Sequence, residues 1–453
     1  MNKIGRIYGD IVDNKFSFAT KTFFDGDFVV IKKNERDDTS GMLVCEIVNR
    51  SVYNKFLSSP EIVKYMDDQM DFSKDTIYTY VVSALGTVKN GKLSYDKINA
   101  LPGKTVYEAN ADLLKQVFDI TDTGIEIGYL KKMPECRVTL EVDRIFQPHM
   151  FVVGKTGSGK SYFMQHFLQG VREKFWVFSP SEEYNDAVKG HKGKVQTEFI
   201  LMLDVDNLSY YMNLNASEEM ILKSIVFDNE KIYSNKEIKE EIYRYFSKKQ
   251  KAKSGQLVLD LGLNSEEEVD LPAYANSLIL KLRNIGHLKF SKDAKRTSIP
   301  KETAIFDMSN YSQLEQECIL NYYLFKLLVS CKKTKEENRK KHIIVIEEAH
   351  NFVPSMRNTL SKEILIRLAR EGRKYGISLC FITQRPRYFD QTALSQSGNK
   401  IIFSLPNPDD VKHVIEDIAY YKPELALNIQ RQRRGECIIA GDAYNDVLEV
   451  IVK

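Results

Sequence analysis

Long apolar stretches and paired cysteines are both missing from this 453-residue sequence. No run of 18 or more apolar residues occurs, so the sequence predicts no helix that crosses a membrane. The opening residues, MNKIGRIYGDIVDNKFSF, contain no apolar core of a secretory signal. The six cysteines form no C-x-x-C pair or other metal-binding spacing, which is typical of reduced cysteines in an intracellular protein. Together these absences predict a cytoplasmic protein.

A strong charge of either sign is also absent. The chain has 65 basic and 62 acidic side chains, and the net charge of +3 is too small to indicate a nucleic-acid partner by itself. We find no internal repeat and no low-complexity tract. Hydrophobic residues make up 43% of the chain, which is enough for a packed core, and the length suits two or three domains.

One short motif predicts a nucleotide site. The segment GKTGSGKS, residues 154–161, fits the pattern G-x-x-x-x-G-K-[ST] at every position. The apolar residues 151–153 before it are typical of a buried strand. Phe163, Phe167 and Val171 after it are spaced by four, as on one face of a helix. A glycine-rich loop between a strand and a helix is the setting that a phosphate-binding loop needs.

The residue types in this loop predict ATP and Mg²⁺ as cofactors. Glycines allow the backbone to wind tightly and to point its N–H groups at phosphate oxygens, and the following helix N-terminus adds partial positive charge. We expect Lys160 to reach the β- and γ-phosphates and Ser161 to ligate Mg²⁺. The predicted nucleotide-binding residues are Gly154, Lys155, Thr156, Gly157, Ser158, Gly159, Lys160 and Ser161.

Hydrolysis also requires acids, and a second motif supplies them. Residues 343–346 form an apolar run typical of a buried strand, and Glu347 and Glu348 follow it directly. Parallel sheets bind their ligands at the carboxyl ends of the strands. We expect Glu347 to hold the Mg²⁺ shell through water and Glu348 to polarise the attacking water. A further predicted strand, residues 377–384, ends at Gln384, which is placed to sense the γ-phosphate.

Basic residues lie between these two strands. Arg367, Arg370 and Lys374 fall on one stripe of a predicted helix, with Arg373 beside it. Such a stripe is either a solvated helix face or the source of an arginine finger, which neutralises charge on the transferred phosphoryl group of a neighbouring subunit. Arg144, just before the loop strand, is a rival candidate for the finger.

The flanking segments differ in character from this core. Residues 1–105 are rich in Val, Ile, Phe and Tyr with turn residues between, which predicts a small β-barrel or sandwich, with an inserted helix near 59–70. Residues 106–143 form a linking segment with one helix and two strands. The alternation of strands and helices after residue 144 predicts an α/β core with a mainly parallel sheet. The predicted divisions of that part are 144–214 and 301–435 for the core, 215–300 for a helical insertion, and 436–453 for a C-terminal β segment.

Four segments together resemble the HerA-type hexameric ATPases, relatives of the FtsK DNA translocases. They are GKTGSGKS (154–161), IIVIEEAHNF (343–352), EGRKYGISLCFITQRP (371–386) and RRGECIIAG (433–441). The order of a β-barrel, an ATPase core with a helical insertion, and a final β segment is also similar. The resemblance covers most of the chain, and the third segment is its most specific part.

The resemblance implies a RecA-like P-loop core in a homo-hexameric ring that hydrolyses ATP between subunits and translocates on double-stranded DNA. It also implies a nuclease or another effector as partner, in DNA end processing or antiviral defence. Carried over, Glu347 organises the metal, Glu348 is catalytic and Gln384 is the sensor. In the segment FSPSEEY (178–184), Ser179 stands where the family tends to have an aspartate, while Glu183 and Tyr184 fit the family pattern.

Two other functions remain open from the sequence. One is an ATPase of the conjugation or secretion type, which has a similar core but drives protein or pilus subunits. The N-terminal barrel without a membrane anchor favours the DNA motor over it. The other is a nucleotide-gated scaffold that assembles and activates an effector enzyme, which the small net charge keeps open.

Overall fold

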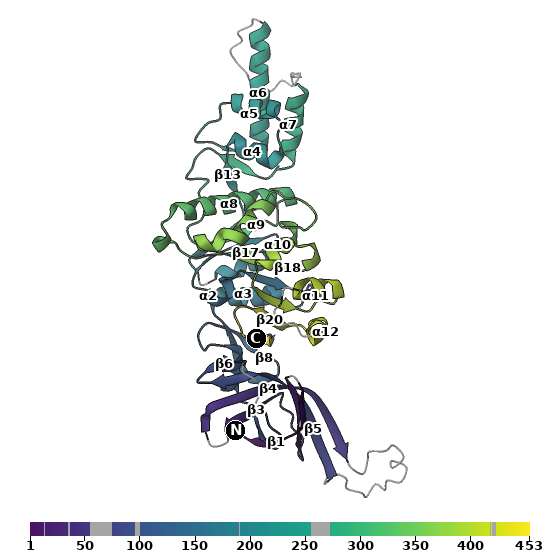
Figure 1. Ribbon diagram of the computed structural model, residues 1–453. Helices are drawn as coiled ribbons and strands as arrows, with labels where there is room; N and C mark the ends of the chain where they lie inside the picture. The colour runs from purple at the N-terminus through teal and green to yellow at the C-terminus, as the bar shows by residue number, and fades with distance from the viewer. Residues whose placement is uncertain are drawn as a thin grey trace, which may run out of the picture. The chain divides into compact units, whose positions relative to one another are not determined.

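The computed structural model describes residues 1–12, 14–34, 37–54, 75–95, 100–189, 191–254, 272–416, 418 and 423–453. It divides into two compact units, each described by itself below (Figure 1). Unit 1 contains residues 1–145, 401–404 and 418–453, and unit 2 contains residues 146–400 and 405–417. In the described ranges, no helix is both long and apolar enough to cross a membrane.

Unit 1 begins with a closed β-barrel. Its strands are β1 (Lys3–Val12), β2 (Lys15–Thr20), β3 (Phe28–Asn34), β4 (Asp37–Asn54), β5 (Thr76–Lys89), β6 (Lys92–Ser94) and β7 (Thr105–Glu108). They lie in the order β2-β1-β7-β3-β4-β5-β6, and β2 also pairs with β5, so that six strands close on themselves. This confirms the predicted barrel. The helix predicted near 59–70 lies outside the described residues.

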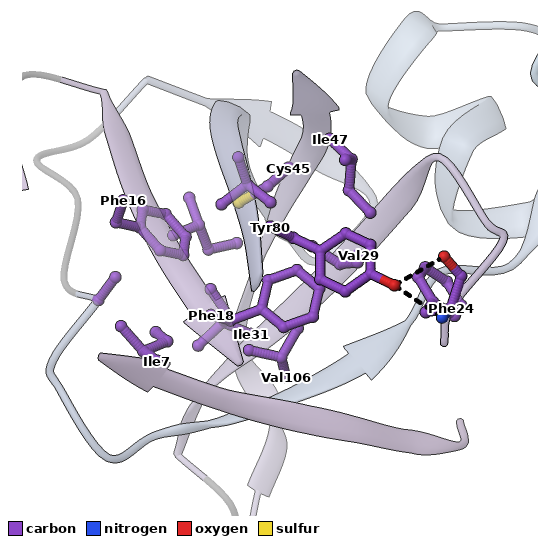
Figure 2. Packing of buried hydrophobic residues seen from close by; sticks show 13 residues of the cluster. Ile7, Phe16, Phe18, Phe24, Val29, Ile31, Cys45, Ile47, Tyr80 and Val106 are labelled. Atoms are coloured by element: carbon purple, nitrogen blue, oxygen red, sulfur yellow. Dashed lines mark hydrogen bonds between the residues drawn. The ribbon is translucent and has the colours of Figure 1, made fainter. Parts of the chain in front are cut away.

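Alternate side chains of these strands fill the barrel, as Figure 2 shows. The ring of Phe18 stacks on that of Tyr80 with 4.8 Å between centroids. The Tyr80 hydroxyl accepts a hydrogen bond from the Phe24 N–H at 2.7 Å and donates to the Phe24 carbonyl at 3.1 Å. A buried hydroxyl is costly unless it is hydrogen-bonded, so these two bonds let tyrosine serve as a core residue.

The remainder of unit 1 joins segments from both ends of the chain. It holds α1 (Ala111–Phe118), β8 (Ile125–Leu130), β9 (Met133–Leu140), α2 (Val142–Phe146), α12 (Pro423–Arg431), β20 (Glu436–Gly441) and β21 (Leu448–Val452). Strand β21 pairs antiparallel with both β20 and β8, and β8 pairs with β9. A Cβ on Gly128 would lie 2.0 Å from the Ile451 carbonyl oxygen, so only glycine permits this approach. The predicted linking and C-terminal segments are therefore parts of one sheet.

Unit 2 contains the predicted parallel sheet. Six strands lie in the order β12-β16-β11-β17-β18-β10, and all five neighbouring pairs are parallel. Their bounds are β10 Met150–Val153, β11 Lys174–Ser179, β12 Gly193–Gln196, β16 Thr303–Asp307, β17 His342–Ile346 and β18 Ile377–Thr383. The connecting and following helices are α3 Lys160–Gly170, α8 Gln313–Lys333, α9 Lys362–Glu371, α10 Gln391–Ser395 and α11 Pro408–Ile415, while β19 spans Asn399–Phe403. Strands β10 and β16 are buried along their whole length, as expected for a sheet with both faces covered.

The predicted helical insertion, residues 215–300, contains helices α5 (Ala216–Ser224), α6 (Asn235–Ser254) and α7 (Ala273–Arg283), while α4 (Val205–Met212) precedes it in the segment predicted as core. A capping box stands at the start of α6, since Glu237 accepts from the Ser234 N–H at 2.7 Å and its own N–H lies 3.4 Å from the Ser234 hydroxyl. The structure differs in one respect. A small sheet pairs β15 (Lys289–Ser291) of this segment with β14 (Ile232–Tyr233) and with β13 (Ile200–Met202), which lies before the predicted start of the insertion. These strands have two or three residues each, too few for a period-2 pattern to show.

Candidate functional site

The phosphate loop, residues 154–161, connects β10 to α3. Gly157 and Gly159 have φ of 75° and 116°, which residues with a Cβ rarely adopt. The Lys160 ammonium donates to the carbonyls of Gly154 at 2.7 Å and Lys155 at 3.0 Å. Burial lowers the pKa of Lys160, although the charges of Glu348 and Glu347 oppose this shift. The loop thus holds a buried amine at the centre of its own turn, where a phosphate group would need a counter-charge.

Helix α3 holds the end of this loop in place. Its first residues are Lys160 and Ser161, and its inner face buries Phe163 and Phe167, whose rings stack with 6.0 Å between centroids. Ser161 lies close to Tyr184, which is fully buried and whose pKa is raised by burial. The tyrosine is therefore a neutral hydroxyl beside the predicted metal-binding serine.

Glu347 lies at the carboxyl end of β17. Its N–H donates to the Phe178 carbonyl at 3.0 Å, which extends the strand pairing, and its carboxylate accepts hydrogen bonds from Ser179 and from Ser181, the latter at 3.1 Å. Burial raises the pKa of Glu347 to about 7, against the effect of the serine hydrogen bonds. An aspartate in place of Ser179 would bring a second negative charge to this carboxylate, whereas serine donates to it.

The Glu348 side chain points toward Gln384 rather than toward the serines that contact Glu347. Its φ of 47° is in the left-handed region, where a residue with a side chain is uncommon. Its carboxylate accepts a hydrogen bond from the Gln384 amide at 2.6 Å, and the Gln384 amide oxygen accepts one from the Thr156 hydroxyl. Burial raises the pKa of Glu348, while the charge of Lys160 lowers it. Three segments far apart in the sequence are thus joined by the hydrogen-bonded chain Thr156–Gln384–Glu348.

The structure brings together Lys160, Glu347, Glu348 and Gln384, as the sequence predicted. It also adds residues that sequence reasoning missed. His350 lies with its Nδ1 2.9 Å from the Thr383 hydroxyl and 3.2 Å from the Glu348 carboxylate. Burial lowers the pKa of His350 to about 4, so the ring is neutral near pH 7. Its position two residues after the acid pair was the only signal in the sequence.

Glu183 is a further residue near the site. Its negative charge acts on both Lys160 and Glu347, and its carbonyl accepts a hydrogen bond from the Gln165 amide of α3. The side chain is exposed. The sequence marked Glu183 as part of a family-like pattern, but the pattern alone did not predict that it lies beside the phosphate loop.

The four candidate finger arginines have different surroundings. Arg367 lies 3.9 Å from Glu371, and both side chains are about half exposed. Arg370 is exposed, and Arg373 is exposed with one long hydrogen bond of 3.5 Å to the Gln147 carbonyl. These three can therefore be reached by another subunit.

Arg144 is held within unit 1. Its guanidinium binds the Asp119 carboxylate at 2.6 Å, donates to the Ala443 carbonyl, and lies 5.9 Å from the centre of the Tyr444 ring. Since these contacts stabilise the unit itself, they favour the other three arginines as finger candidates.

No group of three or more His, Cys, Asp or Glu side chains that could hold a metal ion by itself occurs in the part of the chain that the structure describes. Mg²⁺ usually keeps several waters and binds proteins through one or two carboxylates together with substrate phosphates. Ser161 and Glu347 beside the phosphate loop fit that kind of site, because they supply one hydroxyl and one carboxylate.

Comparison with known proteins agrees with this arrangement. The family model described as "Helicase HerA, central domain" matches residues 125–327. The DNA double-strand break repair helicase HerA of Pyrococcus furiosus is 24% identical, over 97% of this chain and 90% of that protein. The protein of the same name from Sulfolobus acidocaldarius is 25% identical, over 99% of this chain and 92% of that protein. This chain is therefore similar to HerA helicases over nearly its whole length.

The family match runs from β8 to α8, so it includes the phosphate loop and ends before the acid pair. The near full-length relatives extend the similarity across Glu347, Glu348 and Gln384. Among solved structures, VirB4 of Thermoanaerobacter pseudethanolicus is similar over 74% of this chain and 98% of that chain, with 16% identity and a TM-score of 0.48.

Proposed function

We propose that this protein is a HerA-type ATPase that uses ATP and Mg²⁺ to move along double-stranded DNA as a ring of six subunits. The observation that carries the proposal is the hydrogen-bonded chain Thr156–Gln384–Glu348, because it connects the phosphate loop to the carboxylate that can activate water. The similarity to DNA double-strand break repair helicases supports DNA as the track.

The residues of the site have distinct roles in this proposal. Lys160 supplies the counter-charge for the β- and γ-phosphates, and Ser161 and Glu347 hold the metal with its waters. When bound, Mg²⁺ neutralises charge that develops on the phosphate oxygens. Glu348 accepts a proton from the attacking water, for which its carboxylate must be ionised.

Gln384 is placed to connect the chemistry with movement. Its amide touches both the phosphate loop and the catalytic carboxylate, so a γ-phosphate arriving at the loop would compete for the same hydrogen bonds. Strand β18, which ends directly before Gln384, lies between β17 and β10. A change at Gln384 would thus act on the strand directly between the acid pair and the phosphate loop.

We further propose that a nuclease or another effector protein works with the ring, in DNA end processing or antiviral defence. The repair function in the relatives' names supports the first of these settings. The resemblance described above supports a partner of this kind in either setting.

The test measures ATP hydrolysis with and without linear duplex DNA at about 50 mM and about 200 mM salt. We expect DNA to stimulate hydrolysis, and more strongly at the lower salt concentration, because phosphate contacts weaken as salt rises. The Lys160→Ala variant controls for contaminating ATPases. If DNA does not change the rate of ATP hydrolysis at either salt concentration, the proposed DNA motor is rejected. Stimulation by an effector protein alone would then favour the nucleotide-gated scaffold.

A further inference from the structure

A second polar site lies in unit 2, at strand β12. It is a pocket of about 780 Å³ between β12 and the segment that follows β15, residues 295–303. Strand β12 is at one end of the six-strand order and β10, which leads to the phosphate loop, is at the other. None of the residues that line this pocket belongs to the nucleotide site described above.

The lining of the pocket is positively charged. Its cationic members are Lys192, Lys194, Lys295, Arg296 and Lys301. Only two carboxylates line it, Glu198 and Glu302, and both already have partners. Glu198 lies 3.1 Å from Lys289, and Glu302 lies 3.3 Å from Lys174. Neither of these partner lysines lines the pocket, so both lining carboxylates are paired with cations outside it.

Four of these cations form no ion pair with an acidic side chain among the described residues. Arg296 pairs with Asp293 at 3.5 Å, but within the described residues Lys192, Lys194, Lys295 and Lys301 form no ion pair. All four are exposed. Like charges around one hollow repel each other, and a solvated surface gains nothing from gathering them there. A polyanionic ligand would relieve this repulsion.

Residues 295–303, which carry Lys295 and Lys301 and form one wall of the pocket, are fixed by hydrogen bonds to neighbouring residues. The Asp293 carboxylate accepts from the Lys295 N–H at 2.8 Å, which forms a tight turn. Thr297 is buried, and its carbonyl accepts hydrogen bonds from the Tyr322 hydroxyl at 3.1 Å and the Lys326 ammonium at 2.8 Å. Helix α8 therefore fixes this segment, so the lysines project from a preformed wall.

The floor of the pocket is polar. The Gln196 amide donates to the Tyr323 hydroxyl at 2.8 Å, and both residues line the pocket. Ile200, Ile299 and Pro300 also line the pocket, beside its five cationic side chains. The cations can bind a charged ligand, and the apolar side chains supply surface against which it can pack.

We propose that this pocket binds phosphodiester groups of double-stranded DNA, separately from the ATP site. The inference rests on the proposed function and names residues that contact the track. Lysine binds phosphate as a point charge with little demand on geometry, whereas paired recognition of carboxylates favours the planar fork of arginine. Four unpaired lysines therefore suit a phosphate backbone better than an acidic peptide.

The experiment uses the full-length protein and a fluorescent duplex, with binding followed by anisotropy across a range of salt concentrations and without nucleotide. The test variant is Lys194→Gln with Lys301→Gln, one change from each wall. Each lysine that neutralises a phosphate contributes about 0.9 to the slope of log K against log salt. We expect the slope of the double variant to be smaller by about 2, and its affinity at low salt to fall roughly tenfold or more.

The matched control is Lys248→Gln with Lys335→Gln, which removes the same charge from exposed positions outside the pocket. Its slope should equal that of the wild type, and ATP hydrolysis without DNA should be the same in all three proteins. An unchanged slope in the pocket variant, with normal DNA binding by the wild type, overturns the pocket alone and leaves the proposed function standing. If the wild type binds no duplex at low salt, both are rejected. Displacement of the duplex by polyglutamate at lower concentration than by inorganic polyphosphate would assign the pocket to an acidic protein segment instead.

Discussion

Lys160 is the residue on which nucleotide binding depends most directly. Its ammonium hydrogen-bonds only to carbonyls of its own loop, so nothing else in the described site holds it. Lys160→Ala removes the fixed positive charge that a phosphate group needs. We expect nucleotide affinity to fall by roughly tenfold to a hundredfold, as for a lost charged hydrogen bond, and hydrolysis to become undetectable. Titration with a fluorescent ATP analogue and a phosphate-release assay measure the two effects. Near-normal ATPase activity would contradict the role of the loop.

The two adjacent glutamates should separate by function. Glu348→Gln keeps the size of the side chain and its contact with Gln384 but cannot act as a base. We expect this variant to bind ATP normally and to hydrolyse it at least about a hundredfold more slowly. Glu347→Gln should instead weaken Mg²⁺-dependent binding. If Glu347→Gln retained binding and lost only turnover, the two roles would be the reverse of those proposed. Equilibrium binding and single-turnover kinetics on both variants decide between them.

His149 makes folding depend on pH. It is completely buried, accepts a hydrogen bond from the Leu379 N–H at 3.0 Å, and lies 3.0 Å from the Ala369 carbonyl. Burial lowers its pKa from 6.5 to about 4. The unfolded chain therefore binds a proton at a higher pH than the folded chain does. The contribution of His149 to the free energy of unfolding is therefore fully present above pH 6.5 and is lost as the pH falls toward 4. The loss amounts to at most about 3 kcal/mol.

The variant His149→Asn tests this dependence, because asparagine tolerates the left-handed φ of 59° at this position. We expect a smaller decrease in the free energy of unfolding between pH 6.5 and 4 in the variant than in the wild type. Urea denaturation at several pH values measures the difference. Parallel curves for the two proteins would show that His149 does not titrate as described.

At the scale of elements, the capping box at Ser234 and Glu237 gives a local test of the insertion. The Ser234 hydroxyl donates to the Glu237 carboxylate at 2.8 Å and lies 3.4 Å from the Glu237 N–H at the start of α6. Ser234→Ala removes the cap, which usually costs about 1 kcal/mol. We expect faster hydrogen exchange in the first turns of α6 and unchanged exchange in β17. Ser247→Ala, at a half-buried position further along the same helix, is the control. Equal hydrogen exchange in the first turns of α6 in both variants would show that the capping box does not stabilise this end of the helix.

At the scale of the whole molecule, the proposed ring makes one active site depend on two chains. We expect the protein with ATP and Mg²⁺ to form hexamers by light scattering. A monomer at micromolar concentration, with and without nucleotide, would contradict the ring. If Arg373 is the finger, Arg373→Ala should leave nucleotide binding intact and reduce turnover by ~10³-fold or more.

Mixed rings sharpen that test. Subunits with Arg373→Ala and subunits with Lys160→Ala are each nearly inactive alone. In rings that contain both, some interfaces pair an intact phosphate loop with an intact arginine, so part of the activity should return. No recovery in rings proven to be mixed would mean that Arg373 acts within its own chain or structurally. Parallel mixtures with Arg367, Arg370 and Arg144 variants would identify the finger.

The sequence by itself determined the features that local patterns encode. The phosphate loop is specified by residue types at fixed spacing, and the strands that end directly before Glu347 and Gln384 are short apolar runs. The capping box of α6 is likewise a pattern of four consecutive residues. Such features depend on backbone conformation and burial of nearby residues, so they can be predicted without knowing what lies far away in the chain.

Only the tertiary structure decided which distant segments meet. The pairing of β21 with β8 requires Gly128 to lie against Ile451, more than 300 positions away, and no local pattern reports that contact. The hydrogen bond from Ser179 to Glu347 and the link from Thr156 through Gln384 to Glu348 arise for the same reason. Parallel strands bring their carboxyl ends to one edge of a sheet whatever their separation in sequence. The order of the strands, which is set by how the whole core packs, determines which of those ends become neighbours.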